Sequence, residues 1–403
     1  MSKIRIVTYQ LGVLLCLMTG LLLSACSGDS TSDSPVSDRQ IRLTAGTRQF
    51  SVDEEEAVSP AATRSVTYPN TTDWQKYVDH SNMLVFMAKS KENPSSSDVL
   101  SRLCSFSSAN ADWQANVTIT DVTSKYNIFG FMPIDIENSS DNVSISRLPS
   151  KSNYDAGAQM TIRGLKVLTL SDPCVIVGVT EPDANNNYNL KQRWGKFDFT
   201  FKQNTTGDVT DYMSILVDHI YSRFNFTIKI DADYAQMRTI RVTKMTLEAL
   251  SDDGTKTLRS VDATVSITAN TTNTNPITGI SFSRNTGERS VTIFDKTTTT
   301  NTDYTNGIVL AKEKTDFQDV GYCLAPCNQR WFRLTTEYEV LDRTGKLIRT
   351  NTVPNTFNTA NFKEKVINST TPGLDHTIQI IVNPTYLYVL TDSDLDNPPI
   401  GIN

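Results

Sequence analysis

Large apolar and polar side chains alternate without a break in the stretch Phe224-Asn225-Phe226-Thr227-Ile228-Lys229-Ile230. Successive side chains of a β-strand point to opposite faces of the sheet, so a two-residue period is typical of a strand that is buried on one face. The same period recurs in Phe332 to Val340 and in Ile378 to Val382. These stretches predict sheets that cover a core with one face and meet water with the other.

Short strand-like runs and polar turns make up most of the remaining chain. Cys174 to Val179 is a continuous apolar run, as expected for a strand buried on both faces. One helix is expected at Ser97 to Phe106, which opens with Ser-Asp and then carries spaced apolar residues. Many short strands with turn signals between them predict an all-β protein built from two tandem β-sandwich domains.

The domain boundary is expected at the polar stretch Asn204-Thr205-Thr206-Gly207. The N-terminal sandwich would then cover residues 41–205 and the C-terminal sandwich residues 206–403. The chain has 403 residues, and two domains of this size are each long enough to bury a core. The formal net charge is −6, and no basic patch indicates a nucleic-acid partner.

The start of the chain carries an export signal. Lys3 and Arg5 precede an apolar run that ends in Leu23-Ser24-Ala25-Cys26. A basic start, an apolar middle and small residues before a cut site describe a secretory signal, expected here over residues 1–25. The last four residues resemble the lipobox of bacterial lipoproteins, which implies that Cys26 is acylated and begins the mature chain.

A flexible tether is expected over residues 26–40. Ser27 to Asp38 is rich in Ser and Asp and has almost nothing to bury. It resembles the acidic, Ser-rich leader of Bacteroidetes surface lipoproteins, which implies export to the outer face of the outer membrane. The lipid would be the membrane attachment of this chain.

Four cysteines remain after cleavage and acylation: Cys104, Cys174, Cys323 and Cys327. Exported proteins form disulfides, and Cys323 and Cys327 flank only three residues, so the loop geometry decides between a disulfide and two thiols.

The sequence carries no signature of catalysis. It contains no Gly-rich phosphate loop, no Gly-x-Ser-x-Gly elbow and no Cys-x-x-Cys pair. The three histidines, His80, His219 and His376, are far apart in the chain. We therefore predict no enzyme activity, no cofactor and no metal site.

Two arginines are candidates for proteolytic cleavage. Ile41 to Ala45 alternates and is expected to form the first strand, and the acidic and small residues of Asp53 to Ser65 are typical of a loop. Exposed loops are where proteases cut best, which favours Arg64. Arg48, closer to the first strand, is the second candidate.

Several segments together resemble the fimbrillin family of Bacteroidetes pilin-like lipoproteins. They are Cys26 with its polar leader, Ile41–Ala45, Ala62-Thr63-Arg64-Ser65, Asp218 to Lys229, Pro384 to Val389, and Asp394-Leu395-Asp396-Asn397-Pro398. The resemblance implies two transthyretin-like β-sandwich domains. It also implies head-to-tail assembly in which an Arg-specific protease, cutting at Arg64 or Arg48, removes the first strand.

Strand exchange gives each segment a role. Ile41 and Leu43 would fill a groove of the precursor, and a neighbour's strand would replace them by β-augmentation. The candidate donor strand comprises Tyr386, Leu387, Tyr388, Val389 and Leu390. Implied partners are other fimbrial subunits, the outer membrane through the lipid, and a host or bacterial surface ligand; the sequence does not separate stalk, anchor and tip.

A glycan-binding surface lipoprotein is the alternative. Trp74, Trp113, Trp194 and Trp331 offer aromatic faces that stack on sugars, although packing in a core is the other use of such residues.

Overall fold

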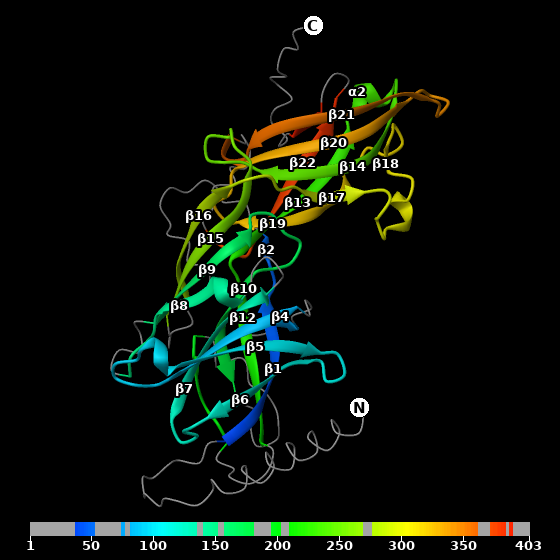
Figure 1. Ribbon diagram of the computed structural model, residues 1–403. Coiled ribbons are helices and arrows are strands. Elements are labelled where there is room, and N and C mark those ends of the chain that lie inside the picture. The colour runs from blue at the N-terminus through cyan, green and yellow to red at the C-terminus, as the bar shows by residue number, and fades with distance from the viewer. Residues whose placement is uncertain are drawn as a thin grey trace, which may run out of the picture.

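A computed structural model describes residues 37–52, 74–76, 81–134, 140–151, 157–180, 195–202, 209–268, 276–361, 371–383 and 387–389 (Figure 1). Strands dominate these ranges. Their helical pieces are the single α-helix α2 (Ala232–Ala235) and the 3-10 turns η2 (Ser96–Asp98), η3 (Ser140–Asn142), η6 (Thr302–Tyr304) and η7 (Thr359–Asn361). The all-β prediction is confirmed. Among the described residues, no helix has the length and hydropathy that crossing a bilayer requires.

Nine strands form sheet A, which occupies the lower body in Figure 1. They are β1 (Ser37–Arg48), β3 (Trp74–Lys76), β4 (Asn82–Lys89), β5 (Val99–Ser107), β6 (Asp112–Ile119), β7 (Lys125–Ile134), β10 (Cys174–Thr180), β11 (Asp198–Thr200) and β12 (Val209–His219). Their order is β10-β12-β1-β6-β5-β4-β7-β11, and β10 also pairs with β7. The sheet therefore closes on itself from β7 through β1 to β10, and its interior holds a core of its own.

Sheets B and D form a sandwich in the upper body. Sheet B contains β2 (Ser51–Val52), β13 (Tyr221–Ile230), β19 (Gln318–Pro326), β22 (Leu374–Val382) and β23 (Leu387–Val389). Sheet D contains β14 (Thr239–Ala249), β17 (Val291–Asp295), β18 (Ile308–Leu310), β20 (Trp331–Leu341) and β21 (Leu347–Asn358). Phe224 of β13 and Phe332 of β20 meet across the two sheets with ring centroids 5.2 Å apart.

The alternating stretches occupy the positions that their period predicts. Phe224, Phe226 and Ile228 are buried on β13, whereas the polar residues between them are only partly buried. The same alternation of burial follows β20 and most of β22. The run from Cys174 is buried along the whole of β10, as expected for a strand covered on both faces.

Sheet C joins segments from the two expected domains. It contains β8 (Val143–Arg147), β9 (Ala158–Lys166), β15 (Leu258–Ile267) and β16 (Ile277–Thr286) in the order β16-β15-β9-β8. The strand β12 likewise lies in sheet A beside β1, although it follows the expected boundary at residues 205/206. That boundary therefore falls between two strands of one sheet, because the pairings that decide sheet membership are long-range.

Two local expectations were wrong. Residues 97–106 do not form a helix; they are mostly β5, which pairs with β4 on one side and β6 on the other. The backbone ladders to two neighbouring strands outweigh the local helical pattern there. The tether also ends earlier than expected, because β1 begins at Ser37 and its first residues already pair with β6.

Two chain segments pass from sheet A into sheet B. The first runs from β1 into β2, which pairs with β22, and the second runs from β12 through Ile220 into β13. β1 and β12 are parallel neighbours, so the two segments cross between the bodies at the same place.

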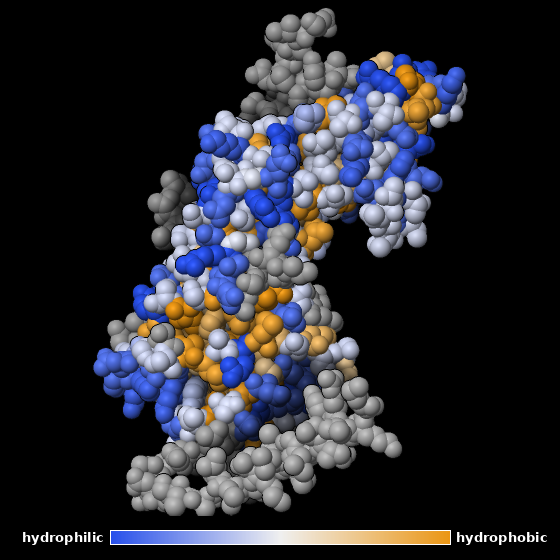
Figure 2. All heavy atoms as spheres, viewed as in Figure 1, coloured by the Kyte–Doolittle hydropathy of each residue, from blue (hydrophilic) through white to orange (hydrophobic). Residues whose placement is uncertain are grey.

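Figure 2 shows apolar residues grouped on the lower body of the face in view, whereas the upper body carries mostly hydrophilic and intermediate residues.

Gly130 tests the closure of sheet A. A Cβ atom at this position on β7 would lie 2.5 Å from the carbonyl oxygen of Leu84 and 2.7 Å from Cδ1 of Ile176. We expect Gly130→Ala to lower the free energy of unfolding by about 1–3 kcal/mol, because backbone atoms cannot move aside cheaply. Denaturant titration measures the change. Gly279→Ala is the control, since its Cβ would meet only Ser266 at 3.8 Å, and an equal loss in both variants would contradict the close approach.

Candidate functional site: the first strand in its groove

β1 is an interior strand of sheet A. Residues Arg39 to Thr47 pair in parallel with Val209 to Val217 of β12, and Ser37 to Leu43 pair antiparallel with Trp113 to Ile119 of β6. An interior strand satisfies the backbone groups of both neighbours, so its removal would leave two open edges. The groove between β6 and β12 is thus filled by the N-terminal part of the same chain.

Apolar side chains of β1 enter the core of sheet A. Ile41 and Leu43 are both 0% exposed, and Ala45 on the same face is buried as well. All three belong to the core cluster enclosed by the closed sheet. Burying an Ile or Leu side chain stabilises a fold by about 1.5–3 kcal/mol, so these residues hold β1 in place.

Each arginine of β1 forms an ion pair with an aspartate of a neighbouring strand. Arg39 Nε lies 2.8 Å from Asp211 of β12, and its side chain is 0% exposed. Arg42 Nε donates to Asp112 of β6 over 2.6 Å. Sequence analysis missed these pairs, because the partners lie 172 and 70 residues away along the chain.

The third arginine closes the end of β1. Arg48 Nε lies 3.1 Å from Asp218 Oδ1, and the two side chains are 4% and 0% exposed. Gly373, in the turn before β22, packs against this pair: a Cβ there would lie 2.5 Å from the Arg48 guanidinium. The chain continues from Arg48 into β2, where Ser51 N donates to Gly373 O over 2.9 Å.

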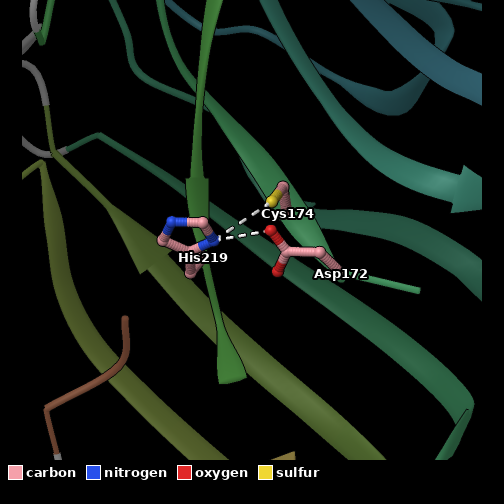
Figure 3. Close-up of side chains that lie close together, drawn as sticks. All are labelled: Asp172, Cys174 and His219. Carbon is pink, nitrogen blue, oxygen red and sulfur yellow. Dashed lines mark hydrogen bonds and ion pairs between the residues drawn. The ribbon is translucent and has the colours of Figure 1, made fainter. Parts of the chain in front are cut away.

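A buried polar group lies at this crossing, and we call Arg48, Asp172, Cys174, Asp218 and His219 the junction cluster. His219 Nδ1 is 2.7 Å from Asp172 Oδ2 and 3.8 Å from Cys174 Sγ (Figure 3). His219 Nε2 donates to the carbonyl oxygen of Arg48 over 2.7 Å, because a carbonyl can only accept. His219, at the end of β12, therefore contacts β1 and the start of β10 together.

Burial and two nearby carboxylates shift the pKa values of His219 and Cys174 in the junction cluster. Burial of His219 opposes its positive charge, but Asp172 and Asp218 outweigh this effect and raise the pKa of the imidazole. Burial raises the pKa of the Cys174 thiol well above its ordinary value, and Asp172 and Asp218 raise it further. Within the protein alone, Cys174 is therefore a neutral thiol beside a His–Asp ion pair.

The structure describes one of the two candidate cleavage sites, Arg48, but not the other. Arg64 lies outside the described residues, in the range 53–73. Arg48 is the last residue of β1 and is 3% exposed. Proteases cut exposed and mobile segments, so the burial of Arg48 and its ion pair disfavour cleavage at this position in the folded chain.

The candidate donor segment is paired within its own chain. Leu387–Val389 forms β23, which pairs antiparallel with Val382 to Ile380 of β22. Tyr386 and Leu390 lie outside the described residues, as do Cys26 and the signal segment 1–25. β23 is three residues long and is attached to sheet B through β22.

Cys323 and Cys327 do not form a disulfide. Both are buried and belong to no disulfide, and the same is true of Cys104 and Cys174. Cys323 lies within β19, and the extended strand runs on to Pro326, so the chain carries the two cysteines apart instead of closing a small loop between them. Burial also raises the pKa of the Cys327 thiol to about 12.

Two tryptophans described by the structure pack against the protein. Trp113 is 1% exposed and donates from Nε1 to Ser81 O over 2.8 Å. Trp331 is half-buried, and its ring lies against Gly254. The side chains of Trp74 and Trp194 are outside the part of the protein that the structure describes. The rings of Trp113 and Trp331 therefore pack against the protein, and the burial of Trp113 leaves no face of that ring for a sugar.

Comparison with solved structures finds fimbrial and adhesion proteins. A fimbrial protein from Bacteroides vulgatus ATCC 8482 is 13% identical, with a TM-score of 0.38 over 87% of this chain and 97% of that chain. A candidate cell adhesion protein from Bacteroides uniformis ATCC 8492 is 11% identical, with a TM-score of 0.36 over 87% and 95%. The fimbrial anchor protein Mfa2 from Porphyromonas gingivalis is 11% identical, with a TM-score of 0.25 over 84% and 90%. No protein-family model and no curated protein sequence matches the chain.

Asp211 tests the ion pairs of β1. We expect Asp211→Asn to lower the free energy of unfolding by roughly 3–5 kcal/mol, because Arg39 would remain buried without its counter-charge. Asp252→Asn is the control: Asp252 also pairs with an arginine, Arg284, but its side chain is 76% exposed, so the change should stay below about 1 kcal/mol. Equal losses by denaturant titration would contradict a special role for the first strand.

Proposed function

We propose that this chain is a structural protein of surface fimbriae and forms the membrane-anchored end of the fibre, where it serves adhesion. The observation that carries the proposal is the position of β1: it is an interior strand, its apolar side chains are fully buried, and each of its arginines is ion-paired. The role is structural, and catalysis has no part in it.

Strand exchange supplies the assembly step of this proposal. A subunit with an empty groove accepts a strand from its neighbour by β-augmentation, and head-to-tail acceptance yields an open filament. A subunit that keeps β1 has no empty groove. It can then only donate a strand, so it occupies one end of the fibre.

The ion pairs favour retention of β1. If another strand replaced β1, Asp211 and Asp218 of β12 would lose Arg39 and Arg48 and would again be covered. Each uncompensated buried charge costs roughly 3–5 kcal/mol. A replacement strand with the composition of residues 386–390, Tyr-Leu-Tyr-Val-Leu, carries no cation to offset this cost.

Retention of β1 also retains the lipid. The segment from Cys26 leads directly into β1, which begins at Ser37. Even after cleavage at Arg64, β1 would connect the acylated Cys26 to the folded body through its ladders and ion pairs. This connection supports a position at the membrane end of the fibre, with residues 386–390 as the segment offered to the adjoining subunit.

An Arg-specific protease tests the proposal. After cleavage of the detergent-solubilised mature chain, we expect the fragment that ends at Arg64 to co-elute with the body in gel filtration, because β1 remains docked. Denaturant should separate the two pieces. Arg64→Ala is the control for the cut site, and mass spectrometry identifies the fragments.

The double variant Asp211→Asn/Asp218→Asn sharpens this experiment. It removes both partners of the buried arginines, so the cleaved fragment should dissociate much faster than in the unmodified chain. Spontaneous release of the fragment from the unmodified chain, followed by polymers of the body, would instead assign a stalk role and overturn the anchor proposal.

A further inference from the structure

We propose that Asp172, Cys174 and His219 form a binding site for a divalent transition-metal ion of the zinc class. One carboxylate oxygen, one sulfur and one imidazole nitrogen lie within 4.8 Å of one another. They come from two neighbouring strands, since Cys174 of β10 pairs directly with His219 of β12. This site is independent of the fimbrial role proposed above.

The separations are close to those of a tetrahedral centre. Zinc–ligand bonds of 2.0–2.3 Å at tetrahedral angles place ligand atoms roughly 3.3–3.6 Å apart. Cys174 Sγ and His219 Nδ1 are 3.8 Å apart. Asp172 Oδ2 and His219 Nδ1 are 2.7 Å apart, as a hydrogen bond requires, and would separate by about half an ångström around an ion. In Figure 3 the carboxylate and the thiol both approach the same ring nitrogen.

The ring of His219 is held in the orientation that a ligand needs. Its Nε2 donates to the Arg48 carbonyl oxygen, which is the outer contact that metal-binding histidines make with a backbone carbonyl. The Phe50 ring stacks on it with centroids 3.9 Å apart. Both contacts leave Nδ1 directed toward Asp172 and Cys174, so the protein fixes which nitrogen would bind.

Charge and donor type select the ion. Arg48 and Asp218 compensate each other, so a thiolate at Cys174 and the carboxylate of Asp172 would balance a divalent cation. Sulfur and imidazole donors favour zinc and its neighbours, whereas calcium and magnesium require oxygen donors. The Asp172 side chain is 19% exposed, so it forms the edge through which an ion could enter.

A bound ion would join three parts of the fold. It would connect β10, the end of β12 and, through the His219–Arg48 contact, the end of β1. The competing interpretation is a buried His–Asp ion pair with a thiol beside it and no affinity for metal. The experiment below separates the two, because only a metal site gives a sulfur–metal bond.

Cobalt(II) is the probe. The mature chain carrying Cys26→Ser is stripped with a chelator and titrated with Co²⁺. We expect one ion per chain, a near-ultraviolet thiolate-to-cobalt charge-transfer band and the visible absorption of a tetrahedral centre. Zinc should displace the band, and calcium should not. If the folded chain with an unsubstituted cluster shows no thiolate-to-cobalt band, the proposal is overturned.

Variants locate the site. Cys174→Ser and His219→Gln should lose the band, whereas Cys323→Ser and His376→Gln change a buried cysteine and a buried histidine elsewhere and should retain it. A band that is lost in these two controls but retained in the two cluster variants would also overturn the proposal. Should a cluster variant fail to fold, X-ray absorption at the cobalt edge of the chain without cluster substitutions gives the same decision, because a bound thiolate adds a sulfur neighbour at about 2.3 Å.

Discussion

The buried ion pair between Arg48 and Asp218 lies where the two halves of the molecule are joined. Two segments, 37–52 and 209–230, pass together from sheet A into sheet B, and this pair connects them. A buried charge is costly unless it is matched, so the pair is worth little as net stability but constrains which partner each strand accepts. The apolar side chains of β1 supply most of the stability of its docking, whereas the ion pair constrains which strand can occupy the position.

Much of the fold could be predicted from local patterns. The alternation in 224–230 identified β13 because a two-residue period reports burial on one face regardless of the partner strand. The expected helix at 97–106 failed for the opposite reason: its sequence is ambiguous, and pairing with β4 and β6 decides its state. The expected boundary at 205/206 failed to divide the sheets because β12 pairs with β1, about 170 positions earlier in the chain.

The candidate site, like the fold, could be predicted from the sequence only in part. Alternation predicted a strand at residues 41–45, and the family resemblance implied that Ile41 and Leu43 fill a groove; both are fully buried. Nothing local indicated that Arg48 is buried, since its aspartate is 170 residues distant. The cluster of Cys174 and His219 was missed likewise, because 45 residues separate them and only the β10–β12 register brings them together. Ligands 45 residues apart follow no short spacing motif, so nothing in the sequence indicated this cluster.

Buried charge pairs can make a groove specific for one particular strand, which apolar contacts alone cannot do. A groove lined only by apolar residues accepts any strand of suitable alternation, which suits subunits that exchange strands repeatedly. Asp211 and Asp218 instead require cations at two fixed positions of the incoming strand, and Arg39 and Arg48 supply them at the required spacing. A strand that lacks either cation leaves a buried carboxylate unpaired, so the groove distinguishes its own first strand from a generic donor. On the proposal that the mature chain keeps β1, its retention would follow from where these charges lie.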